Sequence, residues 1–327
     1  MKILLTGASG LLGCNVAHEL VRRGHALRLL VRPGSSLKGV EGLPFEVHYG
    51  CLEEEASLSG AVNGCDGVIH AASCTAQWPT AFRHFEAANV NGAIQLARAA
   101  KAAGIRRFVY VSTANTFGHG TMEQPGTELS EFRLFHYHSG YVNSKYLAQQ
   151  YVLEQVEQHG LPAVVVNPTF MLGPLDLKPS SGRLLLQGLK ARVQWIPPGG
   201  KNFIHVRDAA IGVCQALERG LPGECYLLAG ENLSYRSFYN LLNEVAGRKP
   251  LQLPVPGILA RGVGVLGSLF GKLTGRPAWI NHVTGRMACL GNYYSGRKAV
   301  EELGLPQTPV REAVNDAIDW FRAEGRL

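Results

Sequence analysis

Tyr141 and Lys145 are the residues whose types and spacing point most directly to chemistry. They stand at the start of a helical pattern, and a separation of four residues places both side chains on one helix face, about 6 Å apart along the axis. A phenol with a pKa near 10 needs a depression of about three units to act as an acid or base at neutral pH, and an ammonium group about 4 Å away supplies that much. The same spacing also recurs by chance in helices where it has no chemical role.

Two hydroxyl residues, Ser112 and Thr113, stand at the end of an apolar segment that is predicted to be a strand at 107–112. A hydroxyl at the carboxyl end of a strand can hold a substrate carbonyl oxygen while negative charge develops on it. Hydroxyl residues that merely end a strand are the alternative, which we would favour if Tyr141 and Lys145 were absent.

A glycine-rich turn, Gly7-x-x-Gly10-x-x-Gly13, separates a predicted strand at 2–6 from a predicted helix at 11–23. Such a turn directs backbone N–H groups and the positive end of a helix toward one point, which suits a pyrophosphate. A plain strand-to-helix turn is the less favoured alternative. The residues of this predicted phosphate site are Gly7, Ser9, Gly10, Leu11 and Leu12.

The end of the second predicted strand, at 26–31, indicates which dinucleotide is bound. NAD-binding sheets usually carry a carboxylate there, whereas this strand is followed by Arg32, with no acid before Glu41. An arginine fork matches the 2′-phosphate of NADP, and two serines and Lys38 could assist it. The sequence therefore favours NADP over NAD, the alternative being that Arg32 only opens a turn.

Strand-like and helix-like patterns alternate through the first half of the chain. Strands are expected at 2–6, 26–31, 45–49, 67–71, 107–112 and 162–167, and helices at 11–23, 80–103 and 139–159. This alternation predicts an α/β fold, namely a Rossmann-type doubly wound parallel sheet with a smaller, mostly helical C-terminal substrate lobe. We expect a dinucleotide-binding domain at 1–172, to which 203–229 returns with a helix at 207–219 and a strand at 224–228, and a substrate lobe at 173–327.

Composition narrows the class of protein further. The chain has 327 residues and a net charge of +7, but its basic residues are dispersed and no nucleic-acid motif is present. The seven cysteines include no C-x-x-C pair, so we expect reduced thiols and no metal site.

Because Met1-Lys2 leads directly into strand sequence, we expect a cytoplasmic protein. The apolar segment 255–273 is too short to span a membrane, and we expect a buried or pocket-covering helix there rather than an interfacial anchor.

Several motifs together resemble the extended short-chain dehydrogenase/reductase family (the NAD-dependent epimerase/dehydratase superfamily). They are Gly7-x-x-Gly10-x-x-Gly13, His70-Ala71-Ala72, Asn89-Val90-Asn91-Gly92, Ser112-Thr113, Tyr141-x-x-x-Lys145, Asn167-Pro168-Thr169 and Phe203-Ile204-His205-Val206-Arg207-Asp208. The segment from Leu30 to Ser36 and the tail from Tyr294 to Leu305 resemble the dihydroflavonol reductase and 3β-hydroxysteroid dehydrogenase branch most closely.

The resemblance implies roles for individual residues. Tyr141 would be the general acid or base, Lys145 would bind the nicotinamide ribose and depress the pKa of the tyrosine, and Thr113 would bind the carbonyl, with Ser112 as second choice. Asn89 would order a helix and water near the site. The other residues expected to contact the cofactor are Cys51, Leu52, Ala71, Ala72, Ser73, Pro168 and Thr169. The Gly50-Cys51-Leu52 turn lacks the carboxylate that the family usually offers to adenine. Helices 80–103 and 139–159 match those through which family members form homodimers.

These observations predict an NADP-dependent oxidoreductase that interconverts a ketone or aldehyde and an alcohol. A nucleotide-sugar epimerase with tightly bound NAD is the alternative, disfavoured because Lys201-Asn202 precedes Phe203 where epimerases commonly have arginine. Dehydration is disfavoured because Ala114-Asn115, rather than Asp-Glu, follows Thr113. A cofactor-sensing protein without catalysis is a third hypothesis. Candidate pocket residues are Trp78, Phe82, His138, Met171 and Trp195, although core packing is the alternative for Met171 and Trp195 and a surface cap for Trp78.

Overall fold

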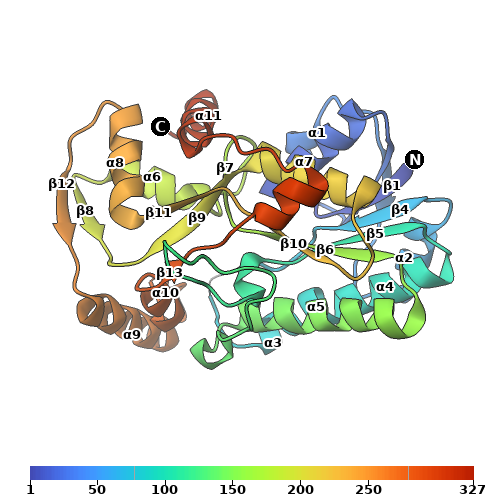
Figure 1. Cartoon of the computed structure of the whole chain (residues 1–327), viewed down its shortest axis with the longest axis horizontal. Helices are drawn as coiled ribbons and strands as arrows, with labels where there is room; N and C mark the ends of the chain where they lie inside the picture. The colour runs from blue at the N-terminus through green and yellow to red at the C-terminus, as the bar shows by residue number, and fades with distance from the viewer. Residues whose placement is uncertain (77, 279) are drawn as a thin grey trace.

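Among the residues that the structure describes, 1–76, 78–278 and 280–327, seven parallel strands form the main sheet, in the order β10-β6-β5-β4-β1-β2-β3 (Figure 1). The structure is a computed structural model of the chain. The strands are β1 Lys2–Thr6, β2 Ala26–Val31, β3 Glu46–Tyr49, β4 Gly67–His70, β5 Arg107–Val111, β6 Ala163–Pro168 and β10 Cys225–Leu228. Every neighbouring pair is parallel, which confirms the predicted doubly wound sheet.

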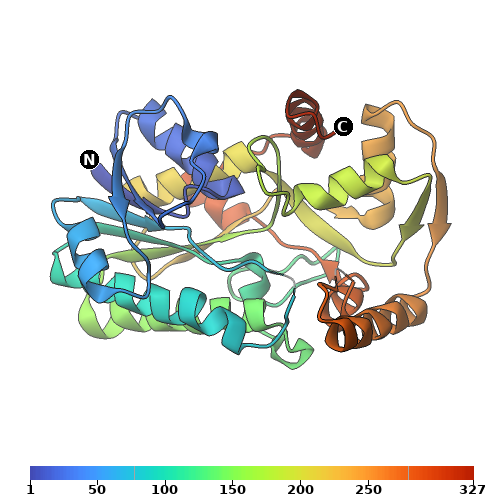
Figure 2. The same ribbon diagram turned by 180° about the vertical axis from the view of Figure 1, so that it is seen from behind.

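Helices cover both faces of this sheet (Figure 2). Since side chains alternate along a strand, Ile3 and Leu5 pack against α1 Leu11–Arg22 and α7 Val206–Arg219, while Leu4 packs with the opposite layer. That opposite layer consists of α2 Glu55–Val62, α4 Gly92–Ala102 and α5 Gly140–His159. The predicted helix 80–103 is divided into α3 Arg83–Phe85, a π-helical turn η2 Glu86–Asn91 and α4.

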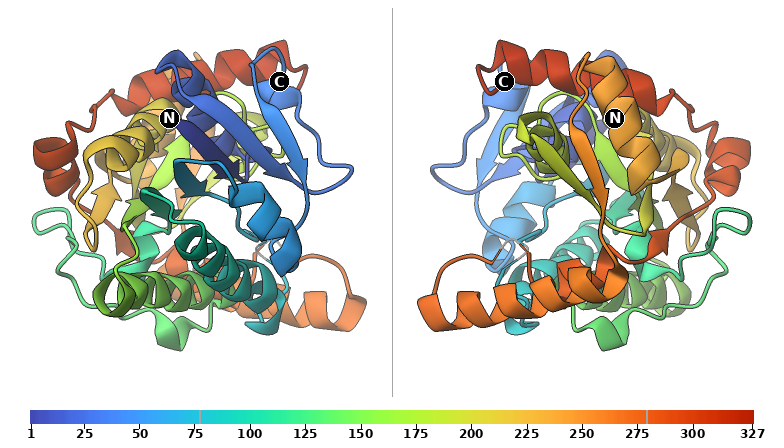
Figure 3. Two further views of the ribbon diagram at one scale, coloured as in Figure 1. Left: turned by 90° about the vertical axis from the view of Figure 1, so that its right-hand side faces the viewer. Right: turned by 90° about the vertical axis from the view of Figure 1, so that its left-hand side faces the viewer.

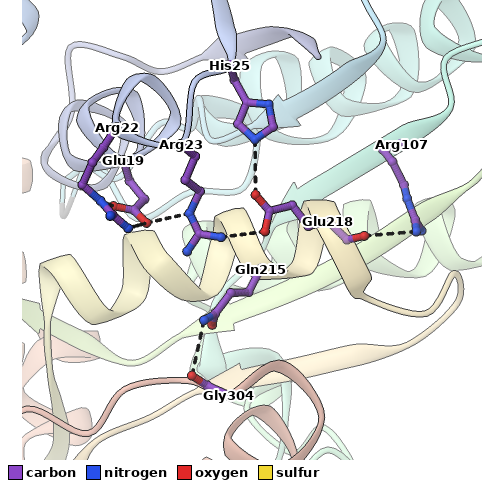
Figure 4. Close-up of polar contacts among 8 residues, drawn as sticks. All are labelled: Glu19, Arg22, Arg23, His25, Arg107, Gln215, Glu218 and Gly304. Carbon is purple, nitrogen blue, oxygen red and sulfur yellow. Dashed lines mark hydrogen bonds and ion pairs between the residues drawn. The ribbon is translucent and has the colours of Figure 1, made fainter.

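An ion-pair network joins the two helices on the α1 face (Figure 4). The Arg23 guanidinium contacts Glu19 of α1 and Glu218 of α7, each at 2.6 Å, and His25 Nε2 lies 3.3 Å from Glu218. The guanidinium of Arg107, at the start of β5, donates to the backbone carbonyl of Glu218 at 3.4 Å. The network fixes the helix that follows the glycine turn against its neighbour.

The C-terminal lobe contains short strands that the sequence did not predict, in addition to the expected helices. A four-stranded sheet is built on β9 Gly200–His205, which pairs with β7 Phe170–Leu172, β11 Glu231–Ser234 and β13 Gly291–Asn292, while β8 Val193–Ile196 pairs with β12 Leu251–Pro254. The helices are α6 Gly182–Lys190, α8 Tyr235–Val245, α9 Gly257–Thr274, α10 His282–Met287 and α11 Val310–Ala323. Single turns lie at η1 Lys38–Val40, η3 Ala114–Thr116, η4 Phe135–Tyr137 and η5 Ala299–Leu303.

Helix α9 lies at the outer edge of the molecule rather than in its interior (Figure 3). Most of its large apolar side chains are exposed, so the prediction of a buried helix is wrong, whereas the alternative of a pocket-covering helix stays a prediction. The physical reason is that its inward side consists of small residues, Gly264, Ser268 and Gly271, which let α9 approach α10 and the preceding loops closely. No helix among the described residues is long and apolar enough to cross a membrane.

Candidate active site

The parallel sheet brings the predicted site residues to one edge. Thr6 is opposite His70, His70 is opposite Tyr110, and Val111 is opposite Val166, so four neighbouring strands end at the same level. The segments that follow these strands carry the residues expected to bind cofactor or substrate. They are Gly7 after β1, Ala71 and Ala72 after β4, Ser112 and Thr113 after β5, and Pro168 and Thr169 at the end of β6.

The glycine turn has the shape that a pyrophosphate needs. Gly7 has a positive φ of 81°, and a Cβ there would lie 2.6 Å from the backbone nitrogen of Ala72, while a Cβ on Gly13 would lie 2.0 Å from the carbonyl oxygen of Gly7. Gly10 is exposed, and a Cβ there would meet only the carbonyl oxygen of Gly7, at 3.4 Å. Helix α1 begins after Gly10, and no side chain of a described residue caps the amides of its first turn, which includes Leu11 and Leu12. These features fit the phosphates of a dinucleotide.

Thr6 and His70 brace this turn against the neighbouring strand, a role that the sequence did not reveal. Thr6 Oγ1 lies 2.8 Å from His70 Nδ1 and accepts a hydrogen bond from the backbone N–H of Ala72 at 3.1 Å. Burial, followed by the charge of Lys145, lowers the pKa of His70 to about 3, so its imidazole is neutral at physiological pH. The pair holds the segment after β4 close to Gly7.

Tyr141 lies in the first turn of α5, which Ser139 caps by accepting the N–H of Val142 at 3.3 Å. Burial raises the pKa of Tyr141 to about 12, while a hydrogen bond with Thr113 acts in the opposite direction. The expected depression of this pKa is therefore wrong for the structure. Desolvation of the phenol dominates, and Lys145 is directed elsewhere.

The side chain of Lys145, a residue of α5, is buried against the end of β5. Its Nζ donates to the backbone carbonyl of Val111 at 2.7 Å and lies 4.3 Å from the centre of the Tyr110 ring. Burial lowers the pKa of this lysine to about 7. The predicted spacing of the two residues along α5 is present, but the ammonium group is anchored to the strand rather than to the phenol.

Thr113 has its side chain at the start of the turn after β5. The threonine is buried, its Oγ1 accepts the N–H of Asn115 at 3.4 Å, and its side chain acts to lower the pKa of Tyr141. Ser112 is also buried, and its Oγ has no hydrogen-bond partner among the described residues. Thr113 is therefore the strand-end hydroxyl residue that lies toward Tyr141, and its role in binding a carbonyl stays a prediction.

A buried amide network supports Thr113 from behind, and sequence reasoning missed it. Asn167 Nδ2 donates to the backbone carbonyl of Thr113 at 3.2 Å and to Gln149 Oε1 at 2.8 Å. Thr116 donates to the same Gln149 oxygen at 2.9 Å. The only local signal is the Asn167-Pro168-Thr169 motif, since Gln149 lies inside a helix with no feature that marks it.

Asn89 joins the loop after β4 to α5. Its Oδ1 accepts from the Cys74 backbone N–H at 2.7 Å and from Ser73 Oγ at 3.1 Å, and its Nδ2 donates to Ser144 Oγ at 2.9 Å. Ser144 in turn donates to the carbonyl of Tyr141 at 2.8 Å. Asn89 therefore orients the turn that carries Tyr141, as a positioning residue, from within the π-helical turn η2.

The residues predicted for the adenosine half lie at the ends of β2 and β3. Arg32 is exposed after β2 and forms no ion pair with a described residue. Lys38 instead pairs with Glu324 of the C-terminal segment at 2.7 Å, which corrects the expectation that it assists Arg32. Cys51 and Leu52 are half-buried after β3, and Leu52 packs close to Gly92.

The nicotinamide-side residues are divided between the sheet and the lobe. Pro168 is buried at the end of β6, whereas the Thr169 hydroxyl donates to Asn202 Oδ1 of β9 at 2.7 Å. Asn202 Nδ2 also bonds the backbone carbonyl of Gly230 at 2.9 Å. Thr169 thus connects the predicted cofactor edge to the lobe.

A cavity of about 340 Å³ lies beside the start of α5. Its lining includes Phe82 and His138, as predicted, and is completed by Thr80, Ala81, Gly140, Asn143 and His282. Trp78 instead packs against α9 at Gly271, and Met171 packs against the main core. Trp195 is 63% exposed on β8, so its prediction as a pocket residue is wrong.

Within the described ranges, no group of His, Cys, Asp or Glu side chains is arranged to hold a metal ion.

Two features meet at the carboxyl edge of this doubly wound sheet, namely a glycine turn whose shape fits a phosphate and a tyrosine–lysine pair. Together they define a class of enzymes that use a nicotinamide dinucleotide. Residues 3–229 match the model of the NAD dependent epimerase/dehydratase family, and the chain belongs to that family. It is 31% identical over 326 residues to a putative dihydroflavonol 4-reductase of Synechocystis sp., with 98% of this chain and 94% of the relative covered. This similarity agrees with the predicted reductase branch.

Solved structures support the fold along the whole chain. The crystal structure of gox2253 is 33% identical, with a TM-score of 0.86 over 100% of this chain and 99% of that one. A nucleoside-diphosphate-sugar epimerase from Pseudomonas aeruginosa is 30% identical, with a TM-score of 0.80 over 100% of this chain and 99% of that one. The chain is therefore an NAD(P)-dependent oxidoreductase of the family, with relatives in both the reductase and the epimerase groups.

Proposed function

We propose that this enzyme is an NADP-dependent reductase or dehydrogenase that interconverts a ketone or aldehyde and an alcohol. The observation that carries the proposal is that Thr113 and Tyr141 come together at the sheet edge that also holds the glycine turn, close enough for the Thr113 side chain to lower the pKa of Tyr141. Two hydroxyl groups that meet at one point can both contact a single carbonyl oxygen. The dihydroflavonol reductase relative supports the same reaction class.

The roles of the residues follow from this arrangement. When bound, the nicotinamide supplies the hydride that reduces the carbonyl carbon. The Tyr141 hydroxyl donates its proton to the carbonyl oxygen, and the Thr113 hydroxyl donates a hydrogen bond to the same oxygen, so that the product is a neutral alcohol. The backbone carbonyl of Val111 keeps the Nζ of Lys145 at this edge, where its ammonium group would bind the ribose of the nicotinamide nucleotide.

The preference for NADP rests on Arg32. Its exposed side chain follows β2 and has no ion-pair partner among the described residues, so its guanidinium can grip a 2′-phosphate with two hydrogen bonds. Titration of NADPH and NADH with the wild type and with Arg32→Ala tests this role. We expect the substitution to weaken NADPH binding roughly tenfold or more and to leave NADH binding unchanged. Equal losses for the two cofactors would contradict it.

The reaction itself is tested by screening ketones and aldehydes with NADPH, using the wild type and Tyr141→Phe. Turnover by the wild type that the substitution largely removes is the expected result. A nucleotide-sugar epimerase remains the second candidate because of the Pseudomonas relative. Copurified nicotinamide cofactor, together with turnover of a UDP-sugar without added cofactor, would favour it. Equal, negligible turnover by both proteins would favour a cofactor-binding protein without catalysis.

We further propose that the enzyme works in the cytoplasm as a homodimer. All seven cysteines are free, as a reducing compartment requires. Helices α4 and α5 lie side by side on one face of the sheet, and Leu147 of α5 is 41% exposed, which leaves apolar surface for a partner. Light scattering of the wild type and of Leu147→Glu tests this dimer, since a charge in the interface should produce monomers.

A further inference from the structure

We propose that α9 is a membrane-docking helix that lies in the surface of an anionic phospholipid bilayer. This surface, the α9 face, comprises eight large apolar side chains of one helix, each at least half exposed. They are Ile258 80%, Leu259 58%, Val263 50%, Val265 55%, Leu266 67%, Leu269 52%, Phe270 54% and Leu273 77%. The proposal concerns binding to a surface and goes beyond the proposed reaction.

The helix is oriented oppositely to an ordinary surface helix. Its small residues, Gly264, Ser268 and Gly271, are buried against the protein, whereas its bulky apolar residues face outward. A Cβ added to Gly264 would lie 2.7 Å from the backbone oxygen of Asn281, so the close approach of α9 to its neighbour depends on small inward residues. A contiguous exposed apolar surface of this kind marks an interaction site.

Charge identifies what covers the α9 face. No Asp or Glu occurs between Glu244 and Glu301, while the same segment contains eight basic residues, namely Arg248, Lys249, Arg261, Lys272, Arg276, Arg286, Arg297 and Lys298. Four of them are exposed on and around α9 and α10, and none of these four forms an ion pair with a described residue. They are Arg261, Lys272, Arg276 and Arg286. An apolar helix face bordered by unpaired positive charge matches the anionic headgroups and acyl chains of a bilayer.

The same charges argue against the two other occupants. A second copy of the chain paired across this face would bring two basic segments without acids together, and like charges repel. A membrane span is also excluded for α9, whose 18 residues include Arg261 and Lys272 and are not long and apolar enough to cross a bilayer. The helix is therefore suited to lie flat in the interface.

Docking in this way places the candidate active site near the bilayer. Helix α9 packs on α10, which contributes His282 to the cavity at the start of α5, and Ser268 of α9 accepts the backbone N–H of His282 at 2.8 Å. Trp78, which precedes the cavity residues of the loop before α3, packs at Gly271. One helix layer, about 10 Å, then separates the cavity from the lipid.

Flotation of the full chain with phospholipid vesicles tests the proposal. The probes are vesicles of phosphatidylcholine alone and of phosphatidylcholine mixed with phosphatidylglycerol. We expect binding to the mixed vesicles that weakens as salt is raised, and little binding to phosphatidylcholine alone. Leu266→Ser combined with Phe270→Ser should weaken binding roughly tenfold or more, because both side chains leave the lipid. Arg261→Gln combined with Lys272→Gln should reduce the salt dependence.

The matched control is Leu129→Ser combined with Leu221→Ser, which alters two leucines, 95% and 59% exposed, that lie far from α9 in the sequence. This control should bind vesicles like the wild type, and all variants should unfold at the same temperature because the altered side chains are exposed. Absence of vesicle binding by the wild type, or equal binding by the Leu266/Phe270 variant, overturns the proposal. The Leu266/Phe270 variant could instead convert an oligomer formed without lipid into a monomer and leave vesicle binding unchanged. That result overturns the proposal and shows that a second copy of the chain covers the α9 face.

Discussion

Helices α5 and α9 are similar in length, yet they bury opposite kinds of side chain. Helix α5 turns Ser144, Lys145 and Gln149 inward and gives each a hydrogen-bond partner. Helix α9 turns glycine and serine inward and leaves its leucines exposed. The contrast teaches that the apolar content of a helix does not decide what it buries. The neighbouring groups on the inward side of a helix decide which side chains it buries. Those groups give α5 a chemical role and leave α9 with an exposed apolar surface.

The largest effect should come from the phenol on α5. Tyr141→Phe removes the proposed proton donor, and we expect kcat to fall by about a hundredfold to ten-thousandfold with the fold unchanged. Steady-state kinetics with a carbonyl substrate found in the screen measures the loss. Tyr151→Phe, on the same helix, is the control and should retain wild-type kcat, because the Tyr151 hydroxyl accepts a hydrogen bond from the exposed side chain of Arg98. Similar losses in both variants would show that α5 is merely perturbed.

The next effect concerns the stability cost of a buried lysine. Since burial lowers the pKa of Lys145 to about 7, the unfolded chain binds more protons than the folded chain between pH 7 and about 10.5, and stability rises with pH across that window. Lys145→Met should therefore stabilise the cofactor-free protein by a few kcal/mol at pH 6, and the gain should shrink as pH rises above 7.

Urea unfolding at pH 6 and pH 9 measures this difference. Lys272→Met, on the exposed face of α9, is the matched variant, and it should leave the free energy of unfolding nearly unchanged at both pH values. A pH-independent gain in Lys145→Met would contradict the assigned pKa.

A matched pair of valines compares the two helices directly. Val152 of α5 is fully buried, whereas Val265 of α9 is 55% exposed. We expect Val152→Ala to cost about 2 kcal/mol, from lost burial and the cavity left behind, and Val265→Ala to stay within about 0.5 kcal/mol. Chemical denaturation of both variants measures the two losses in the free energy of unfolding. Equal costs would mean that the α9 face is covered in solution.

The smallest effect should come from a matched pair of serines. Ser144→Ala leaves Nδ2 of Asn89 without one acceptor, and Ser268→Ala removes the acceptor for the backbone N–H of His282. Each should cost about 1 kcal/mol. Only Ser144→Ala should also lower kcat, because its serine orients the turn that carries Tyr141. A change in unfolding free energy without a change in kcat would reduce Ser144 to a structural role.

Much of the sheet and its edge could be predicted from local patterns. The strands β1 and β2 are short apolar runs bounded by glycine or polar residues, so their limits were predicted correctly. Because all strands of the main sheet run in parallel, the residues that follow them had to meet at one edge, which explains why the structure brings Gly7, Ala71 and Thr113 together.

Other features depend on partners that lie far away in the sequence. Strand β9 is held by β7, β11 and β13, none of which has a pattern of its own beyond a few residues. The burial of Gln149 depends on Asn167 and Thr116, and the pKa of Lys145 depends on how deeply β5 encloses it. The exposure of α9 was missed because its apolar content equals that of a core helix.

The position of β10 at the margin of the main sheet affects how the protein is made. Its neighbour β6 ends at Pro168, whereas β10 begins only at Cys225. At about 5–20 residues per second, a ribosome needs several seconds to synthesise the segment between them. During that interval the backbone N–H and C=O groups along one edge of β6 lack their final partner strand, so this edge is open to pairing with another chain until β10 is added.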